Sequence, residues 1–313
     1  IHEDAIQLLR SHEELTYEVL DQPSDTELPI KIQQADALIV RTAKLSSEVL
    51  KKATRLRVVA RHGVGYDNIP VDVLSRNKTP LATTGDANAV TVAEHAFYLI
   101  LTLAKRGREF DTAVRNGDWE SRNTLQGSEL FGKNLLLVGF GRIGREVGKR
   151  ALAFGMQLHV YDPYVDEQQV GAAGANYVKD LGTFLPKTDF LSLHLPYNLK
   201  NRHIIGHEEL KALPSSAYVI NTARGGLIYE DELFKALESG NLAGAGLDCF
   251  EQEPPSNNLK LLNSGSVIVS PHNASLTAEC TRRLGLVCVE NVVDALTGCL
   301  KKERVVNWDA VHA

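Results

Sequence analysis

The sequence is poor in the features that mark secreted, disulfide-bonded proteins and membrane proteins. Its few cysteines all fall in the last quarter of the chain, and no two stand in C-x-x-C spacing: Cys249, Cys280, Cys288 and Cys299. We expect buried free thiols in a reducing cytoplasm, and no metal site. The longest apolar run, residues 96–104, is interrupted by Thr102 and is too short to span a bilayer. We see no signal peptide.

An excess of positive charge is also missing. Lys and Arg number 34 against 39 Asp and Glu, for a formal net charge of −5, which argues against a general nucleic-acid binder or a protein of anionic membranes. The 313 residues, 43% of them hydrophobic and 23% charged, are typical of a globular protein and too many for one ordinary core. We therefore expect two domains.

The most informative stretch is residues 135–162. Four apolar residues, 135–138, predict a strand that is buried on both faces. Three glycines in G-x-G-x-x-G spacing follow it: Gly139, Gly141 and Gly144. The first makes a tight turn, the second lets backbone N–H groups approach a pyrophosphate, and the third lets helix pack on strand. A helical pattern and a second strand complete the unit, which predicts a dinucleotide site at the helix N-terminus.

The second strand ends on Asp162, where a carboxylate can accept hydrogen bonds from the ribose hydroxyls. Asp162 also repels a 2′-phosphate, so NAD is favoured over NADP, although Arg142 beside the glycines points the other way. The alternative interpretation of the glycines is a flexible turn. The complete order of strand, glycines, helix, strand and acid argues against that alternative.

Helical and strand patterns alternate along the whole chain and predict an α/β protein. We expect two Rossmann-like or flavodoxin-like domains with doubly wound parallel sheets and a cleft between them. Residues 1–88 and 286–313 would form a discontinuous substrate-binding domain, and residues 89–285 an NAD-binding domain. The polar segment 106–131 is interpreted as a dimerisation arm within the second domain. Residues 15–20 predict a strand of the first domain.

The chain opens on a helical pattern, whereas an α/β unit normally begins with a strand. We therefore expect a strand before Ile1 that is absent from this numbering. We expect no regulatory domain after Ala313, and therefore do not expect a long, allosterically controlled form.

Three polar residues each follow a predicted strand and carry the chemistry that we expect: Arg224, Glu253 and His272. Parallel strands bring their carboxyl ends to one edge, so these side chains can converge beside a nicotinamide. A guanidinium holds the carboxylate of a 2-oxo acid and polarises its carbonyl. An imidazole donates the proton, and a carboxylate orients that imidazole and raises its pKa.

Each of these residues taken alone has an ordinary structural interpretation. His272 would be a surface histidine, Arg224 a loop arginine and Glu253 a solvated acid before two prolines. Their joint placement behind a nucleotide fold favours the catalytic interpretation. Five other histidines lack such neighbours in the sequence and are interpreted as structural or pocket-lining: His62, His95, His194, His203 and His207.

Seven stretches resemble the D-isomer-specific 2-hydroxyacid dehydrogenases, over nearly the whole length. They are ARHGVGYDNI (60–69), NAVTVAEHA (88–96), LLLVGFGRIGREVG (135–148), LHLPYNLKNRHII (193–205), NTARGGLI (221–228), GLDCFEQEP (246–254) and PHNA (271–274). The pattern is most similar to short phosphoglycerate dehydrogenase-like members. The resemblance implies an NAD-dependent, dimeric enzyme that closes a hinge between its domains, with Arg224, Glu253 and His272 as the catalytic set.

The resemblance also assigns binding residues. It implies that the backbone of Gly63 and Val64 holds the substrate carboxylate and that Asp248 contacts the nicotinamide amide. The residues implied to contact the cofactor are Val64, Gly139, Gly141, Arg142, Ile143, Gly144, Asp162, Leu195, Pro196, Asn201, Thr222, Ala223, Asp248 and Ala274.

Some positions depart from the family pattern. Asn201 stands where many members carry threonine, and its hydrogen bond to the cofactor is kept as a hypothesis. Pro70 replaces an aspartate and changes the start of a helix, and Leu136 replaces a glycine of the strand before Gly139. Glutamate at position 253, where the formate-specific members have glutamine, argues against formate as substrate.

Two arginines bear on the choice of substrate. Arg41 follows one buried strand of the first domain, and Arg61 stands at the end of another. Together they could bind a second anion, which favours a substrate like 3-phosphoglycerate. They could instead pair with Asp36 or Asp67. Hydroxypyruvate, glyoxylate and sulfolactate are the alternative substrates. An alternative of another class is an NAD-sensing, corepressor-like binding protein, which shares the fold and the triad but acts by binding proteins.

Overall fold

The computed structural model describes residues 1–21 and 27–313, which form two compact units. Unit 1 contains Ile1–Asn88 and Leu276–Ala313, and unit 2 contains Ala89–Ser275. No helix in the described ranges is both long and apolar enough to cross a membrane.

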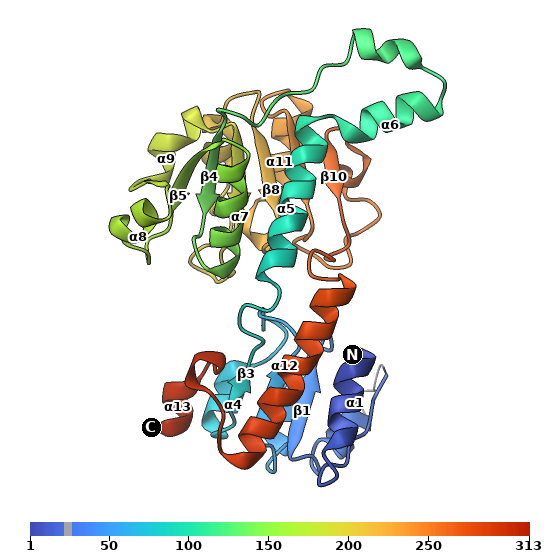
Figure 1. Ribbon diagram of the computed structural model, residues 1–313, viewed down its shortest axis with the longest axis vertical. Helices are drawn as coiled ribbons and strands as arrows, with labels where there is room; N and C mark the ends of the chain where they lie inside the picture. The colour runs from blue at the N-terminus through green and yellow to red at the C-terminus, as the bar shows by residue number, and fades with distance from the viewer. Residues whose placement is uncertain (22–26) are drawn as a thin grey trace. The chain divides into compact units, whose positions relative to one another are not determined.

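Unit 2 is built on seven parallel strands in the order β10-β9-β8-β7-β4-β5-β6 (Figure 1). Their bounds are β4 Asn134–Val138, β5 Gln157–Tyr161, β6 Asn176–Tyr177, β7 Phe190–Leu193, β8 Tyr218–Asn221, β9 Gly244–Leu247 and β10 Val267–Val269. The sheet is interior, because every residue of β7 and β9 is buried. The predicted doubly wound parallel sheet is confirmed here.

Helices cover both faces of this sheet. The helices are α5 Ala89–Ala104, α6 Gly107–Arg115, α7 Arg142–Ala153, α8 Glu167–Ala172, α9 Leu181–Phe184, α10 His207–Ala212 and α11 Glu230–Glu238. One core joins α5 and α7 to the sheet, and the core of the opposite face contains residues of α10 and α11. Short 3-10 turns complete the unit: η1 Trp119–Asn123, η2 Leu185–Lys187, η3 Gly225–Leu227 and η4 Lys260–Asn263.

Unit 1 has a smaller parallel sheet, in the order β1-β2-β3. Its elements are α1 Glu3–Ser11, α2 Glu27–Lys31, β1 Ala37–Val40, α3 Ser47–Lys52, β2 Val58–Arg61, α4 Val71–Arg76, β3 Leu81–Ala82, α12 Ala278–Thr297, η5 Lys302–Arg304 and α13 Trp308–His312. Helix α3 begins after Ser46, whose hydroxyl accepts a hydrogen bond from the Val49 N–H at 3.2 Å. Helix α4 starts after Pro70, which supplies no side-chain cap.

The return of the chain to unit 1 comes ten residues earlier than expected, at Leu276 instead of residue 286. Residue 286 lies inside α12, which is one continuous helix. From its first turn α12 packs on unit 1, since Cys280 and Leu284 are buried and the Cys280 thiol lies 3.8 Å from the carbonyl oxygen of Ala87. A helix that packs along its whole length on one body cannot be divided between two.

Two further predictions need correction. Residues 15–20 form no strand, because a strand requires a ladder partner and β1 pairs only with β2 among the described residues. Val19 is accordingly 68% exposed. The fourth thiol, that of Cys299, is exposed, whereas the other three cysteines are buried as expected, and all four are free.

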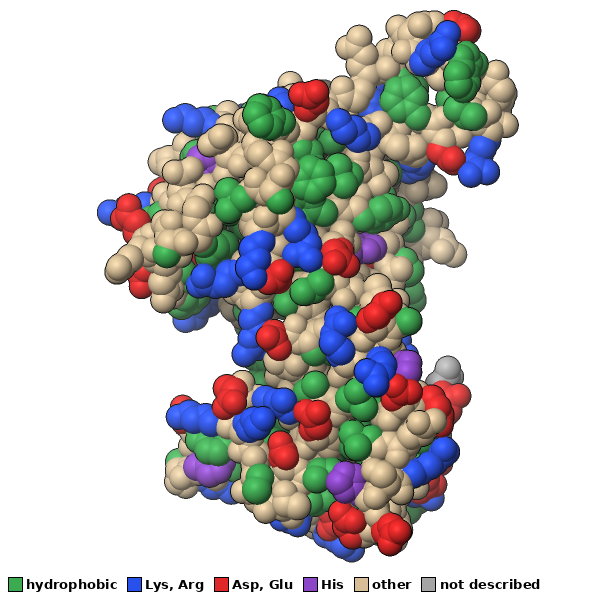
Figure 2. Space-filling view, viewed as in Figure 1, with side chains coloured by type: hydrophobic (Ala, Val, Ile, Leu, Met, Phe, Trp, Pro, Cys, Tyr) green, Lys and Arg blue, Asp and Glu red, His purple; other side chains and the backbone are tan. Residues whose placement is uncertain are grey.

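The predicted arm contains more regular structure than its sequence suggested. Helix α6 and the 3-10 turn η1 lie within it, and neither element has a buried residue. Trp119 is 60% exposed and Val114 is 56% exposed. Figure 2 shows hydrophobic side chains gathered on this part of unit 2. The arm therefore carries apolar surface that unit 2 itself does not cover.

Candidate active site

The candidate site of unit 2 lies along one edge of its sheet because the strand ends are in register. Six residues form a single row across neighbouring strands: Tyr161, Val138, Leu193, Asn221, Leu247 and Val269. The residues that follow this row begin the loops at the carboxyl edge: Asp162, Gly139, His194, Thr222, Asp248 and Ser270. Ligands of open α/β sheets bind at such edges.

The glycine loop is shaped by close backbone approaches. A Cβ on Gly139 would lie 2.5 Å from the carbonyl oxygen of His194, and Gly139 has a φ of +99°. A Cβ on Gly144 would lie 2.3 Å from the carbonyl oxygen of Gly139. Neither position tolerates a side chain. The third glycine of the motif thus packs against the backbone of the first. A later glycine of α7, Gly148, makes the close contact with the neighbouring strand, at Leu158 of β5.

The second glycine faces open space. Beyond Gly141 itself and its neighbours along the chain, no atom of the described residues lies within 4 Å of a Cβ position on Gly141, which is exposed at the start of α7. The first N–H groups of a helix have no acceptor within the helix, so those of Arg142, Ile143 and Gly144 are available to an anion there. Arg142 is exposed and Ile143 is half-buried. This arrangement fits a pyrophosphate.

Asp162 is held against the glycine loop. One carboxylate oxygen accepts the Phe140 N–H at 2.8 Å and the other accepts the Tyr164 N–H at 2.9 Å. Each oxygen keeps a second lone pair. The carboxylate is therefore fixed at the end of β5, where its negative charge opposes a 2′-phosphate.

Five more of the predicted cofactor residues lie in the loops after β7 and β8. The Thr222 hydroxyl is buried and has no hydrogen-bond partner among the described residues, which leaves it available to a ligand. Ala223 and Leu195 are half-buried, and Pro196 is exposed. Asn201 closes its own loop, since its amide donates to the Pro196 carbonyl at 2.6 Å. The structure thus gives Asn201 a loop-closing role.

His272 and Glu253, two of the predicted catalytic residues, form a close pair. The His272 Nδ1 and a Glu253 carboxylate oxygen are 2.7 Å apart. Because a carboxylate only accepts, Nδ1 carries the hydrogen and Nε2 is left for a substrate. His272 has a φ of +49°, a left-handed conformation that is rare outside glycine. The loop must hold this backbone against its own preference.

Glu253 is charged in this setting. Partial burial by itself raises the pKa of Glu253. A larger effect in the opposite direction comes from the hydrogen bond and charge of His272, the Phe250 N–H and the charge of Arg224, so the pKa is lowered overall. The Phe250 N–H donates to the second carboxylate oxygen at 3.1 Å. Glu253 is thus positioned by its own loop as well as by His272.

Arg224 is brought to this pair by one close contact between loops. A Cβ on the next residue, Gly225, would lie 1.9 Å from the backbone carbon of Phe250. Only glycine allows the loop after β8 to touch the loop that carries Glu253. The Arg224 guanidinium also donates to the Ala223 carbonyl at 2.7 Å. The three predicted catalytic residues therefore come from β8, β9 and β10, which are neighbours in the sheet.

Asp248 organises the loop that contains His272. It is 1% exposed, and its two oxygens accept the Asn273 N–H at 2.9 Å and the Ala274 N–H at 3.0 Å. The backbone N–H of Ala274, a predicted cofactor contact, is therefore already engaged. The Ser270 hydroxyl donates to Asp248 at 2.6 Å.

Sequence reasoning missed His95 and Ser270. His95, on α5, lies 2.9 Å from the Ser270 hydroxyl and 3.6 Å from Asp248, contacts that its interpretation as structural or pocket-lining did not specify. The available signal was the helical spacing of His95, Leu99 and Leu103, which places all three on one face of α5.

In unit 1, the predicted substrate arginines lie at the carboxyl edge of its own sheet. Val40 of β1 pairs with Arg61 of β2, so Arg41 and His62 leave the sheet side by side. The Arg61 guanidinium donates to the His62 carbonyl and packs 3.1 Å from the Cβ position of Gly63. Val64 follows and is half-buried.

One alternative partner of these arginines is engaged elsewhere. Both Asp36 oxygens accept hydrogen bonds from Arg55, each at 3.1 Å.

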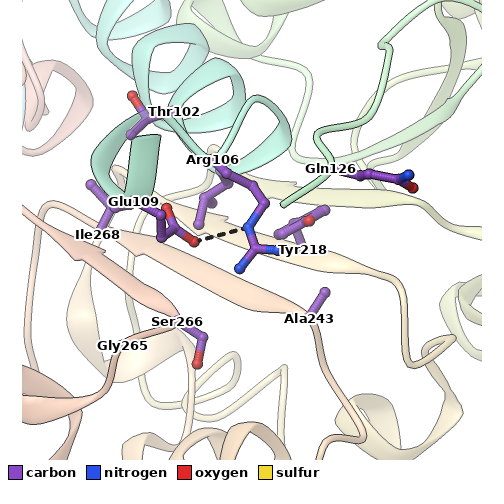
Figure 3. Close-up of a pocket in the computed structure, with 10 residues that line it drawn as sticks. Thr102, Arg106, Glu109, Gln126, Tyr218, Ala243, Gly265, Ser266 and Ile268 are labelled. Atoms are coloured by element: carbon purple, nitrogen blue, oxygen red, sulfur yellow. Dashed lines mark hydrogen bonds and ion pairs between the residues drawn. The ribbon is translucent and has the colours of Figure 1, made fainter. Parts of the chain in front are cut away.

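A pocket of about 520 Å³ lies at the opposite, amino-terminal edge of the unit 2 sheet. Figure 3 shows Arg106 reaching into it, bound to Glu109, with Tyr218 nearby. None of the predicted catalytic residues lines it. It opens at the base of the arm, between α5, α6 and the starts of β8 and β10.

Comparison with known proteins identifies the family. Residues 97–274 match the model of the NAD-binding domain of the D-isomer specific 2-hydroxyacid dehydrogenases. The chain is 40% identical to a hydroxypyruvate reductase of Thermotoga maritima, over 95% of this chain and 96% of that protein. The chain belongs to the D-isomer specific 2-hydroxyacid dehydrogenase family, and unit 2 carries its NAD-binding domain.

Two further relatives extend the comparison. The chain is 39% identical to a D-3-phosphoglycerate dehydrogenase of Methanocaldococcus jannaschii, over 98% of this chain but only 58% of the length of that protein. A D-lactate dehydrogenase of Aquifex aeolicus, solved with NAD and lactic acid, superposes with a TM-score of 0.89 at 29% identity, over 97% of this chain and 96% of that one.

A buried histidine beneath the glycine loop makes stability depend on pH. Burial lowers the pKa of His194 from 6.5 to about 3. Between these values the unfolded chain binds a proton that the folded chain does not, so the free energy of unfolding falls as pH decreases from 6.5. For one such group, the free energy of unfolding decreases by at most about 1.4 kcal/mol per pH unit. In urea titrations between pH 7.5 and 5, His194→Gln should lose less stability than the parent. Equal losses would contradict this assignment.

Proposed function

We propose that the protein is an NAD-dependent D-2-hydroxyacid dehydrogenase that moves a hydride between nicotinamide and C2 of a 2-hydroxy or 2-oxo acid. The observation that carries the proposal is the 2.7 Å distance between His272 and Glu253. The loops that carry these two residues start at the same edge of the sheet as the glycine loop. A candidate proton donor and a candidate dinucleotide site at one edge of one sheet support this activity.

The roles of the residues follow from their chemistry. Bound NAD supplies the hydride acceptor or donor. In the oxidative direction, His272 Nε2 takes the hydroxyl proton as the C2–H bond breaks, and in the reductive direction it returns that proton to the carbonyl oxygen. Glu253 keeps the hydrogen on Nδ1 and stabilises the imidazolium. Arg224 pairs with the substrate carboxylate and polarises the carbonyl.

We infer that unit 2 holds NAD through the glycine loop, the first turn of α7, Asp162, Thr222 and Asp248. We infer that unit 1 is the substrate-binding unit, in which the Gly63 loop takes the substrate carboxylate. The free thiols on three buried cysteines and one exposed cysteine support a reducing, cytoplasmic compartment.

For the substrate we propose a 2-hydroxy acid with a second anionic group, of the 3-phosphoglycerate kind. The support is the placement of Arg41 and Arg61 near His62 on one sheet edge in unit 1. Burial lowers the pKa of His62 to about 4, and the charges of the two arginines contribute to this shift. A neutral His62 adds no charge of its own, so the edge is positive through its arginines. Hydroxypyruvate, glyoxylate and sulfolactate remain alternative substrates.

We also propose that two copies associate through the arm, as a dimer or a dimer of dimers. The support is that α6 and η1 have no buried residue although they carry large apolar side chains. The pocket at the base of the arm adjoins this surface and would be covered in such an assembly.

A substrate panel tests the proposed activity. NADH and NADPH absorbance would be followed with glyoxylate, hydroxypyruvate, pyruvate, phosphohydroxypyruvate and sulfopyruvate, and we expect turnover with NADH. His272→Ala should lower kcat by about 10² to 10⁴-fold, the usual worth of a general acid, while the Kd for NADH stays nearly unchanged. Intact NADH binding without turnover of any compound would instead favour the NAD-sensing binding protein.

Single arginine variants test the second-anion site. Arg41→Ala and Arg61→Ala should raise KM for phosphorylated or sulfonated substrates by about 10-fold or more, since a charge-assisted hydrogen bond is lost, with a smaller effect on glyoxylate. Arg55→Ala, which breaks an exposed pair with Asp36, is the matched control. Equal effects on all substrates would remove the second-anion proposal.

Sedimentation velocity tests the arm. Trp119→Asp and Val114→Asp place charges on exposed apolar positions and should shift the protein from dimer to monomer, without loss of folding because neither residue is buried. Glu120→Gln, on the same exposed turn, should leave the dimer intact. A dimer that survives both aspartate variants would show that association uses another surface.

A further inference from the structure

Helix α5 crosses the sheet of unit 2 in a register that matches strand β9. A Cβ on Gly244 would lie 3.2 Å from a methyl carbon of Leu103, and a Cβ on Gly246 would lie 2.9 Å from the Cβ of Leu99. Four residues along a helix rise about 6 Å, nearly the same as two residues along a strand. The next pair in this series is His95 and Asp248.

The glycines of β9 set the depth of this contact. Any larger residue at position 246 would push α5 away from the strand. With glycine there, the helix lies close enough for the His95 imidazole to reach 3.6 Å from the Asp248 carboxylate and 2.9 Å from the Ser270 hydroxyl. The His95 side chain is 16% exposed and that of Asp248 is 1% exposed, so little solvent competes for these groups.

The direction of the hydrogen bonds follows from chemistry. A carboxylate only accepts, so the Ser270 hydroxyl donates to Asp248. That hydroxyl must then accept from His95, whose Nε2 therefore carries a hydrogen. Asp248 in turn accepts from the backbone of Asn273 and Ala274. The chain of hydrogen bonds runs from α5 to the two residues that directly follow His272.

We propose that His95 is a positioning residue, which acts through Ser270 and Asp248 to hold the loop that carries His272 in its left-handed conformation. His272 itself has no intrinsic preference for a φ of +49°, so its geometry depends on what fixes the backbone after it. His95 contributes one hydrogen-bond donor from a rigid helix to that fixation. It takes no part in proton transfer.

This inference rests on the proposed function for its kinetic test. His95→Phe keeps a ring but removes the donor, and His95→Gln keeps a donor near the position of Nε2. We expect His95→Phe to lower kcat by about 10-fold, the order of loss from a misplaced catalytic group, with KM for the 2-oxo acid nearly unchanged. His95→Gln should recover most of the loss. His207→Gln, an exposed histidine that pairs with Glu232, is the control.

A double-mutant cycle tests the route. Ser270→Ala breaks the bridge, so His95→Phe should cause little further loss in that background, whereas independent effects would multiply. Multiplicative losses would overturn the proposal, as would a His95→Gln variant as slow as His95→Phe.

Hydrogen exchange separates this inference from the proposed activity. Amides of residues 272–275 should exchange faster in His95→Phe than in the parent, and at parental rates in His95→Gln, whether or not any substrate turns over. Loss of protection with an inactive parent would leave the positioning role standing and refute only the dehydrogenase. Unchanged protection in His95→Phe, with an active parent, would refute the positioning role alone.

Discussion

The candidate site depends on one constraint, the register of the parallel strands of unit 2. Because Val138, Asn221 and Leu247 lie in one row of the ladder, the loops that follow them start at the same height on the same edge. The glycine turn, the Thr222 loop and Asp248 are therefore neighbours although more than a hundred residues separate the first from the last. A slip of one residue in any strand would turn its side chains to the opposite face and move its loop away from the others.

Within that frame, the loops hold one another. Gly225 lies against the backbone of Phe250, Phe250 donates to Glu253, and Glu253 accepts from His272. Asp248 fixes the other side of His272. These contacts offset the unfavourable backbone conformation of the histidine, and this is how a strained residue persists at a functional site. The imidazole is thus positioned by the sheet edge rather than by a flexible loop.

Much of this could be predicted from the chain. Buried strands show as apolar runs, helices as spaced apolar residues with a cap, and the glycine pattern with its terminal acid marks the nucleotide edge, because each signal is local. The errors arose where local preference was not decisive. Residues 15–20 have the composition of a strand but no strand to pair with, and α12 belongs to one unit because of the surface it packs on. Helix α6 was missed because it lies in the segment interpreted as an arm, and none of its residues is buried in its own unit.

The sequence by itself determined the family and the α/β alternation, and it predicts Arg224, Glu253 and His272 as the catalytic set, since these depend on residue type and order. Only the tertiary structure decided which polar groups meet around them. His95 is a residue of the second unit's first helix, more than 150 positions before Asp248, and its sequence neighbours show only that it shares a helix face with Leu99 and Leu103. It reaches the carboxylate because two glycines in β9 let helix and strand approach, and such an approach depends on the packing of distant segments.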